Sequence, residues 1–224
     1  MAKLRVGVIL AGSGVQDGSE IHEATLTLYS LDKRGAVAVC MAPNKPQLHV
    51  VDHVTGKPTS ETRNVLVESA RIARGAVRDI REVRADDLDA VIVPGGFGAA
   101  KNLCTFAVDG AACTVDEGVA ALLGAMRRAH KPIGALCIAP AILAKLFGKD
   151  GGVELTIGDD AGTAAALEQL GATHRNARTD EIVVDAKNRV VTTPCYMTAR
   201  GIAEVGDGAD KLVSAVLDLA RKST

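Results

Sequence analysis

The segment Lys131-Pro132-Ile133-Gly134-Ala135-Leu136-Cys137-Ile138-Ala139-Pro140-Ala141-Ile142-Leu143 changes its hydrophobic period at Cys137. The short apolar run before the cysteine is typical of a buried strand, whereas the apolar residues after it recur at helical spacing. Cys137 is therefore predicted at a strand-to-helix corner, beyond the carboxyl edge of a parallel sheet. The free N–H groups and the dipole of the helix end favour a thiolate there. The spacing fits a nucleophile and an ordinary core cysteine equally well.

Small residues flank this cysteine in the pattern of a tight corner. Ala135 and Ala139 stand two positions before and after Cys137, where the Gly-x-Ser-x-Gly elbow has its glycines. Pro140 suits the first helical turn, because the N–H that it lacks would have no partner there. These neighbours favour the corner over a continuous strand.

Composition bounds the class of the protein. A chain of 224 residues that is 47% hydrophobic is predicted to form one α/β domain spanning 1–224. A net charge of −1, with charges of both signs interspersed, favours neither a nucleic-acid partner nor a membrane partner. Five cysteines without a C-x-x-C pair favour a reducing compartment, and no signal-type segment is recognised, so a cytoplasmic protein is predicted.

Strand-like and helix-like patterns alternate along most of the chain. We predict strands at 6–10, 36–41, 89–93, 133–136 and 153–157, a hairpin of 181–185 with 189–193, a short hairpin arm at 47–55, and helices at 62–74, 114–129, 164–170 and 209–221. A further helix begins at Asp17, an N-cap acid with Glu20 three residues later, and ends at Gly35. This order predicts a three-layer sandwich around a mostly parallel sheet, with ligands bound beyond the carboxyl ends of the strands.

Three loops meet at that edge of the predicted sheet: 12–23, 95–102 and the Cys137 corner. The glycines of the first loop miss the dinucleotide spacing by one residue, so a tight turn is favoured over a nucleotide site. Glu20 and Glu23 fit a helix cap and a solvated face, or a catalytic acid. Gly95 and Gly96 fit a flexible turn, or a nest of N–H groups for an oxyanion.

The quoted segments resemble a known family. Val91-Ile-Val-Pro-Gly-Gly-Phe-Gly-Ala-Ala-Lys-Asn-Leu103 and Gly134-Ala-Leu-Cys-Ile-Ala-Pro-Ala141 resemble the ThiJ/PfpI branch of the class I glutamine amidotransferase-like superfamily. Within it, Gly14-Val-Gln-Asp-Gly-Ser-Glu-Ile-His-Glu23, Glu61-Thr-Arg-Asn-Val65 and Val191-Thr-Thr-Pro194 are similar to the ElbB-like, isoprenoid-biosynthesis-associated glyoxalases. The resemblance implies a flavodoxin-like fold, a nucleophile at Cys137, an acid from the first loop, an oxyanion pocket from the N–H groups of Gly96 and Ile138, and a homodimer.

The chain departs from its superfamily where a histidine would activate the cysteine. Thr193-Pro194 stands where amidotransferases have His-Pro, and Ile138 stands where other relatives have a histidine directly after the nucleophile. Glutaminase chemistry is therefore disfavoured, and activation is left to the helix end and a carboxyl group. Glu20 is the first choice for this acid and Glu23 the second, since helix register is uncertain from sequence.

The resemblance implies a lyase-type glyoxalase that converts glyoxal, a small reactive aldehyde, to glycolate. Its scheme uses a cysteine and requires no glutathione, metal or cofactor. The first alternative is an oxidation-sensing or regulatory protein that keeps a reactive cysteine with little turnover. The third is an amidase that acts on a carbon–nitrogen bond. Cys104, Cys113 and Cys195 are expected to be structural.

Overall fold

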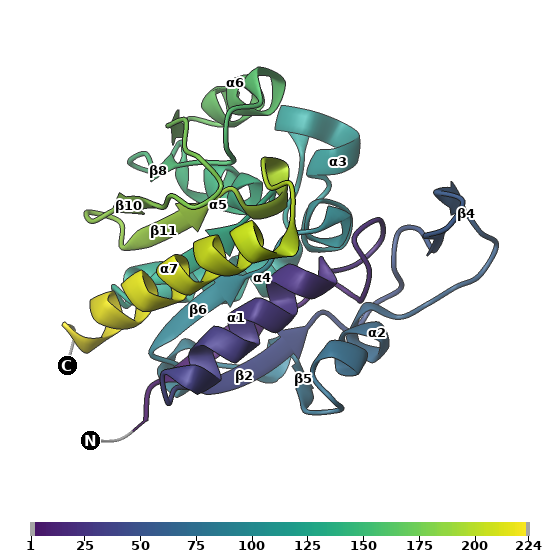
Figure 1. The fold of residues 1–224 in the computed structure, drawn as a ribbon, viewed down its shortest axis with the longest axis horizontal. Coiled ribbons are helices and arrows are strands. Elements are labelled where there is room, and N and C mark those ends of the chain that lie inside the picture. Colours follow the sequence, from purple (N-terminus) through teal and green to yellow (C-terminus); the bar gives the residue numbers. More distant parts are fainter. Residues whose placement is uncertain (1–2, 223–224) are drawn as a thin grey trace.

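A seven-stranded sheet forms the centre of the computed structural model, which describes residues 3–222 (Figure 1). Its strand order is β10-β11-β7-β6-β1-β2-β5. The strands are β1 (Arg5–Ile9), β2 (Val37–Ala42), β5 (Val77–Asp79), β6 (Ala90–Val93), β7 (Ile133–Leu136), β10 (Val183–Asp185) and β11 (Val190–Thr193). All neighbours pair in parallel except β10, which runs antiparallel to β11. The predicted α/β, flavodoxin-like fold with a C-terminal hairpin is confirmed.

Helices cover both faces of this sheet. One face packs against α4 (Glu117–Arg128), α5 (Pro140–Phe147) and α6 (Ala161–Gln169). The other packs against α1 (Ile21–Lys33), α2 (Val65–Ile72) and α7 (Ile202–Arg221). Figure 1 shows α1 and α7 side by side across the sheet. Because successive strand residues point to opposite faces, the buried apolar strands supply both cores.

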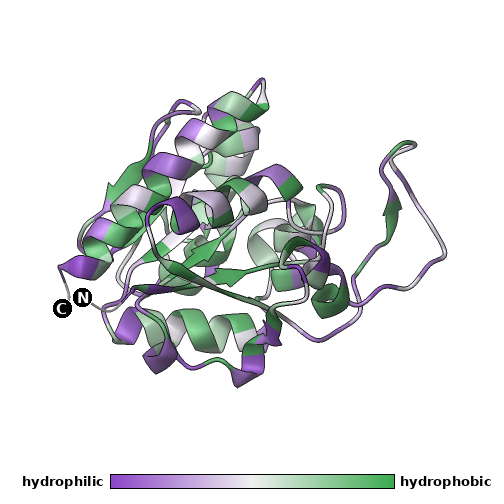
Figure 2. Cartoon of the chain, turned by 60° about the horizontal axis from the view of Figure 1, so that its bottom comes forward, coloured by the Kyte–Doolittle hydropathy of each residue, from purple (hydrophilic) through white to green (hydrophobic). Residues whose placement is uncertain are grey.

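The smaller elements lie at the periphery. They are β3 (Val51–Asp52), β4 (Lys57–Pro58), β8 (Glu154–Leu155), β9 (Thr173–His174), α3 (Phe106–Asp109) and several single-turn segments, among them the turn Cys195–Met197. The hairpin of β3 and β4 projects away from the remainder of the protein in both views (Figures 1 and 2). Figure 2 shows the apolar residues gathered along the interior strands, with polar residues along the outer faces of the helices. Within residues 3–222, no helix combines the length and apolar character needed to cross a membrane.

Three expectations about secondary structure need correction. The strand expected at 153–157 shrinks to β8, which pairs with β9 in a separate two-stranded sheet. The last helix begins at Ile202 and not near 209. Gly208 lies inside this helix, where a larger residue would not fit, because a Cβ would come within 2.7 Å of the Thr179 carbonyl oxygen. The edge strand β5 falls in a stretch whose pattern predicted no strand.

The first helix also begins later than expected. Its N-cap is Glu20, whose side chain accepts the N–H of Glu23 at 2.7 Å. Asp17, the expected cap, instead accepts the N–H of Val51 at 2.7 Å, in the projecting hairpin. The carboxyl of Asp17 is thus engaged across 34 residues of chain, and the cap of α1 is Glu20.

Candidate functional site

Cys137 lies at the strand-to-helix corner that the sequence predicts. It follows the last residue of β7, and its N–H donates to the Thr193 carbonyl oxygen on the neighbouring strand at 2.9 Å. Its φ of +58° is in the left-handed region, which non-glycine residues adopt at a cost of about 1–3 kcal/mol. The residue is only 7% exposed. The backbone thus places the thiol at the carboxyl edge of the sheet, in a nearly buried position.

The glycine pair after β6 lies directly against this thiol. A Cβ on Gly95 would come within 2.5 Å of the Cys137 Cβ and 2.7 Å of Glu23 Oε2, so no larger residue fits there without displacement. Gly96 has a φ of +93°, and a Cβ on it would come within 2.4 Å of the Glu20 nitrogen. The N–H groups of Gly96 and Ile138 lie near the Cys137 sulfur and lower the pKa of its thiol. The structure therefore brings Gly95, Gly96 and Ile138 together at the sulfur, in the arrangement of an oxyanion nest.

Glu23 is the acid that contacts the thiol. Its carboxyl is fully buried, and Glu23 Oε2 and Cys137 Sγ both lie within 3.0 Å of the point where a Cβ on Gly95 would stand. Oε2 accepts the N–H of Gly95 at 2.9 Å, and Oε1 accepts the N–H of Tyr196 at 3.2 Å. Burial, together with the negative charge of Glu20, raises the pKa of Glu23 to about 8 against the lowering effect of these donors. A carboxyl group with such a pKa can take and release a proton near neutral pH.

The protonation states of the Cys137 thiol and the Glu23 carboxyl depend on each other. Burial and the nearby charge of Glu23 raise the pKa of the Cys137 thiol well above its usual value, although the N–H groups of Gly96 and Ile138 lower it. When Glu23 holds its proton, the charge repulsion disappears, and the carboxyl can donate a hydrogen bond to the thiolate. The expectation that the helix end would favour a thiolate therefore needs correction, because burial acts on the thiol more strongly than the N–H donors do.

The order of preference between the two acids reverses. Glu20, the first choice from sequence, caps α1 with its carboxylate and affects the site through its charge. Glu23, the second choice, lies one turn further along the helix and faces Cys137. The catalytic roles of both remain predictions.

Sequence reasoning did not identify Tyr196, which donates to Glu23 through its main chain. The contribution is a backbone N–H, which leaves no signature in the residue type. The turn Cys195–Met197 follows β11 at the same sheet edge, and that position was the available signal. Cys195 has a φ of +43° and is buried, and the cysteines at 104 and 113 are buried and free as well.

The first glycine-rich loop uses its N–H groups internally. Ala11 N–H donates to Ser19 Oγ at 2.8 Å, and Gly12 N–H donates to Ser69 Oγ at 2.9 Å. Asn102 Nδ2 donates to the carbonyl oxygens of Ala11 and Asp17, both at 2.9 Å. These bonds fit the tight turn that the sequence favours over a nucleotide site. Within the described residues 3–222, no group of three or more His, Cys, Asp or Glu side chains is arranged to hold a metal ion.

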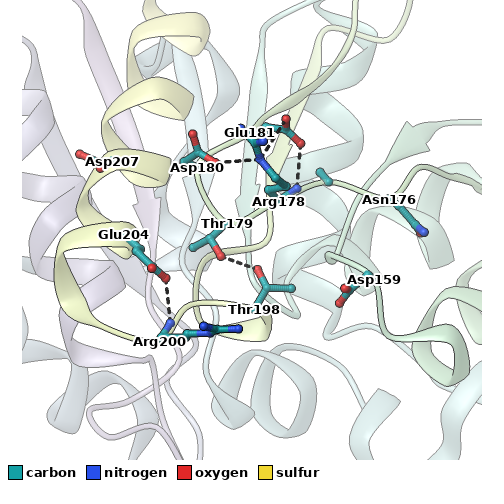
Figure 3. A pocket seen from close by; sticks show the side chains of 11 residues that line it. Asp159, Asn176, Arg178, Thr179, Asp180, Glu181, Thr198, Arg200, Glu204 and Asp207 are labelled. Atoms are coloured by element: carbon teal, nitrogen blue, oxygen red, sulfur yellow. Dashed lines mark hydrogen bonds and ion pairs between the residues drawn. The ribbon is translucent and has the colours of Figure 1, made fainter.

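A polar hollow of about 700 Å³ lies beyond β11 and beside the turn that carries Tyr196 (Figure 3). Three of the charged residues in its wall are paired with one another. Arg178 contacts Asp180 and Glu181, and Glu204 accepts the Arg200 N–H at 2.8 Å. The lining residues do not include Cys137 or Glu23. The hollow is therefore separate from the reactive pair.

Replacing Gly95 with alanine is expected to lower the rate of Cys137 alkylation by iodoacetamide about a hundredfold, the order of cost for displacing reacting groups by 1 Å. The new Cβ would force the thiol and Glu23 apart. Peptide mapping by mass spectrometry measures the rate at Cys137 alone. Gly162→Ala in α6, where the nearest atom lies 3.6 Å from an added Cβ, is the matched control. Equal rates in the Gly95→Ala protein and the control would contradict the close approach.

Comparisons with known proteins give near full-length relatives. The chain is 47% identical over 228 residues to the human "Glutamine amidotransferase-like class 1 domain-containing protein 3, mitochondrial", which covers 97% of this chain and 84% of that protein. It is 34% identical to the zebrafish (Danio rerio) "ES1 protein, mitochondrial", over 97% of this chain and 86% of that protein. A scan against models of protein families finds no match.

The comparison with solved structures also finds similar proteins. An isoprenoid biosynthesis protein with an amidotransferase-like domain from Ehrlichia chaffeensis has a TM-score of 0.91 and 38% identity, covering 96% of this chain and 99% of that one. A DJ-1 superfamily protein from Salmonella typhimurium has a TM-score of 0.58 and 20% identity, covering 98% and 95%, and shows the fold alone.

The relatives correct the expected location. The human, rat and zebrafish proteins, matched over nearly the whole of this chain, are named as mitochondrial, so the prediction of a cytoplasmic protein is wrong. Free cysteines indicate a reducing compartment, but they do not distinguish one such compartment from another.

Proposed function

Because this chain belongs to the class I glutamine amidotransferase-like superfamily and is a relative of the ES1 proteins, we propose that it is a cysteine-dependent, glutathione-independent glyoxalase. The proposal rests chiefly on one observation. A fully buried carboxyl, Glu23, lies beside a cysteine at a strained corner, and burial raises the pKa of this carboxyl to about 8. Glyoxal is the proposed substrate and glycolate the product.

The proposed reaction begins at the sulfur. Ionised Glu23 takes the proton of the Cys137 thiol as the sulfur adds to one aldehyde carbon of glyoxal, and the N–H groups of Gly96 and Ile138 hold the developing oxyanion. Glu23 then gives this proton to the oxyanion, which yields a hemithioacetal and leaves the carboxylate free to act again. Glu23 removes the proton from this carbon and returns a proton to the neighbouring carbon, through an enediol. Water then cleaves the resulting thioester, which releases glycolate and restores the thiol.

The atoms and electrons of this scheme balance without a further reactant. One glyoxal and one water give one glycolic acid. One carbon is oxidised to the carboxyl level while its neighbour is reduced to the alcohol, so no external oxidant or reductant takes part. Because Cys137 is only 7% exposed, a substrate as small as glyoxal suits the site better than a large one.

The test is direct observation of the reaction. The protein is incubated with ¹³C-labelled glyoxal in a buffer that contains a chelator and no thiol, and carbon NMR follows the products. We expect glycolate to appear in equal amount to the glyoxal consumed, faster than in buffer alone. Formation at the buffer rate, or only after glutathione is added, would overturn the proposal.

A second candidate function is oxidation sensing, favoured by the two N–H donors at the sulfur. One peroxide oxidises a cysteine thiolate to a sulfenic acid, a second gives a sulfinic acid, and each step releases water or hydroxide. The donors that would hold an oxyanion would equally hold the sulfinate oxygens. Mass spectrometry after mild peroxide treatment tests this candidate. Sulfinate formed selectively at Cys137, in a protein that does not convert glyoxal, would favour it over the first.

A further inference from the structure

The side chains of His22 and Tyr196 form a hydrogen bond beside the reactive pair. His22 Nδ1 and Tyr196 Oη lie 2.7 Å apart, and the two rings are tilted by 45° with their centroids 5.8 Å apart. His22 lies in the first turn of α1, one residue before Glu23, and Tyr196 lies in the turn after β11. The bond therefore joins the two segments that carry the acid and one of its main-chain donors.

The turn that carries Tyr196 is costly to hold. Cys195 precedes the donated N–H and has a φ of +43°, in the left-handed region. The hydrogen bonds from Met197 N–H to Pro194 and from Ala199 N–H to Cys195 stay within the turn and do not fix it to α1. In the described residues, the hydrogen bonds that join this turn to the start of α1 are the His22–Tyr196 bond and the bond from the Tyr196 N–H to Glu23. An N–H aimed at 3.2 Å from such a turn needs an anchor on the helix.

We propose that His22 and Tyr196 are positioning residues, whose side-chain hydrogen bond holds the Tyr196 N–H against Glu23 Oε1 so that the acid keeps both of its main-chain donors. The inference rests on the proposed role of Glu23 in proton transfer. Neither side chain is required to touch the substrate. Their effect on the reaction passes through the geometry of the acid.

The proton affinity of Glu23 depends on these donors. The Tyr196 N–H is the strongest of the groups that favour the ionised carboxylate, and burial opposes it. The ionisable groups around the carboxyl are Glu20 on the same helix, Cys137 at the end of β7, and Cys195 and Tyr196 on the turn. From α7, which packs along α1, the charged contact is that of Asp210 with Arg34, at the far end of α1. A loosened Tyr196 N–H would therefore leave Glu23 among groups that favour its neutral form.

The variants for the test are chosen to remove or to keep the hydrogen bond between His22 and Tyr196. Tyr196→Phe and His22→Ala remove it, and His22→Asn keeps a polar side-chain atom within reach of the tyrosine hydroxyl. Tyr29→Phe is the matched control, because Tyr29 lies on α1, is 59% exposed and contacts Lys33. The double variant His22→Ala, Tyr196→Phe tests whether the two side chains act as one unit.

The readout is the titration of Glu23 in the full-length protein, followed by carbon NMR with carboxyl-labelled glutamate. We expect the midpoint to rise by about half a pH unit in Tyr196→Phe and in His22→Ala, the size expected for one weakened hydrogen bond. The double variant should shift no further, and His22→Asn and Tyr29→Phe should match the unsubstituted protein. The acidic limb of the pH profile of glyoxal turnover should move in the same direction.

An unchanged midpoint in the single variants, or shifts that add in the double variant, would overturn the positioning role. Because the titration needs no substrate, it decides this question even if glyoxal is not converted. The failure of the positioning role and the failure of the proposed function are thus separate results. Should Tyr196→Phe not fold, His22→Ala and His22→Asn supply the same comparison.

Discussion

Replacing Cys137 with serine is expected to lower glyoxal turnover at least about a thousandfold, the order of loss when an enzyme loses its nucleophile. A hydroxyl is far less acidic than a thiol, and the site holds no strong base to ionise it. The carboxyl of Glu23 releases its proton at about pH 8, far below the range in which a serine hydroxyl ionises. The nearly isosteric side chain should leave the fold and its thermal unfolding temperature close to those of the unsubstituted protein.

The control for this substitution is a second cysteine in an equally buried place. Cys40 in β2 is 7% exposed, as Cys137 is, and lies in the same face of the core without touching the reactive pair. Cys40→Ala should therefore convert glyoxal at the unsubstituted rate. Turnover in Cys137→Ser within about tenfold of that control would assign the reaction to another group, since tenfold is only about 1.4 kcal/mol of barrier.

Replacing Glu23 with glutamine is expected to lower turnover about a hundredfold or more, the usual contribution of a positioned acid or base. An amide fills the same space but neither takes nor gives a proton near neutral pH. The amide nitrogen would also face one of the two N–H groups that the carboxylate accepts. Measured kcat with glyoxal would test this, with Cys137 alkylation as a check that the thiol is still present and reachable.

The same substitution should flatten the dependence of folding stability on pH. An ordinary glutamate has a pKa of 4.5, whereas burial raises the pKa of Glu23 to about 8 in the folded protein, so folding favours the protonated acid. Below pH 4.5 both states hold the proton. Between 4.5 and about 8 the unfolded state has released a proton that the folded state keeps, so stability falls as the pH rises. The full span corresponds to a loss of about 5 kcal/mol at most.

Urea unfolding of both proteins at several pH values between 5 and 8 measures this effect. In Glu23→Gln the loss from this group should be absent, so the difference in unfolding free energy between the two proteins should grow in favour of the variant as the pH rises. Other titrating groups act equally in both proteins and cancel. Parallel stability curves for the two proteins would show that Glu23 is ionised in the folded state throughout the range.

The sequence predicts the corner, the glycine nest and the sheet that brings them together, because each is encoded by a local pattern. The change of period at Cys137 and the paired glycines after β6 need no knowledge of distant contacts. The identity of the acid does need it. Asp17 accepts the N–H of Val51 in the hairpin, α1 is capped by Glu20, and Glu23 in the first turn faces the thiol.

Two further properties of the site come from the assembled structure alone. The depth of burial that raises the pKa values of Cys137 and Glu23 depends on packing from both layers of helices. The donor on Tyr196 is a main-chain group, placed by the backbone path after β11 and not by the tyrosine ring. Residue types along the chain record neither feature.

The left-handed backbone conformation at Cys137 lowers the stability of the fold at the position where the proposed reaction needs a thiol. Glycine adopts that conformation readily, whereas cysteine pays about 1 kcal/mol or more for it. Selection for stability alone would therefore tend to replace Cys137 with glycine and give a more stable protein without the thiol. A cysteine at this corner is therefore expected where the function of its thiol offsets the loss of stability.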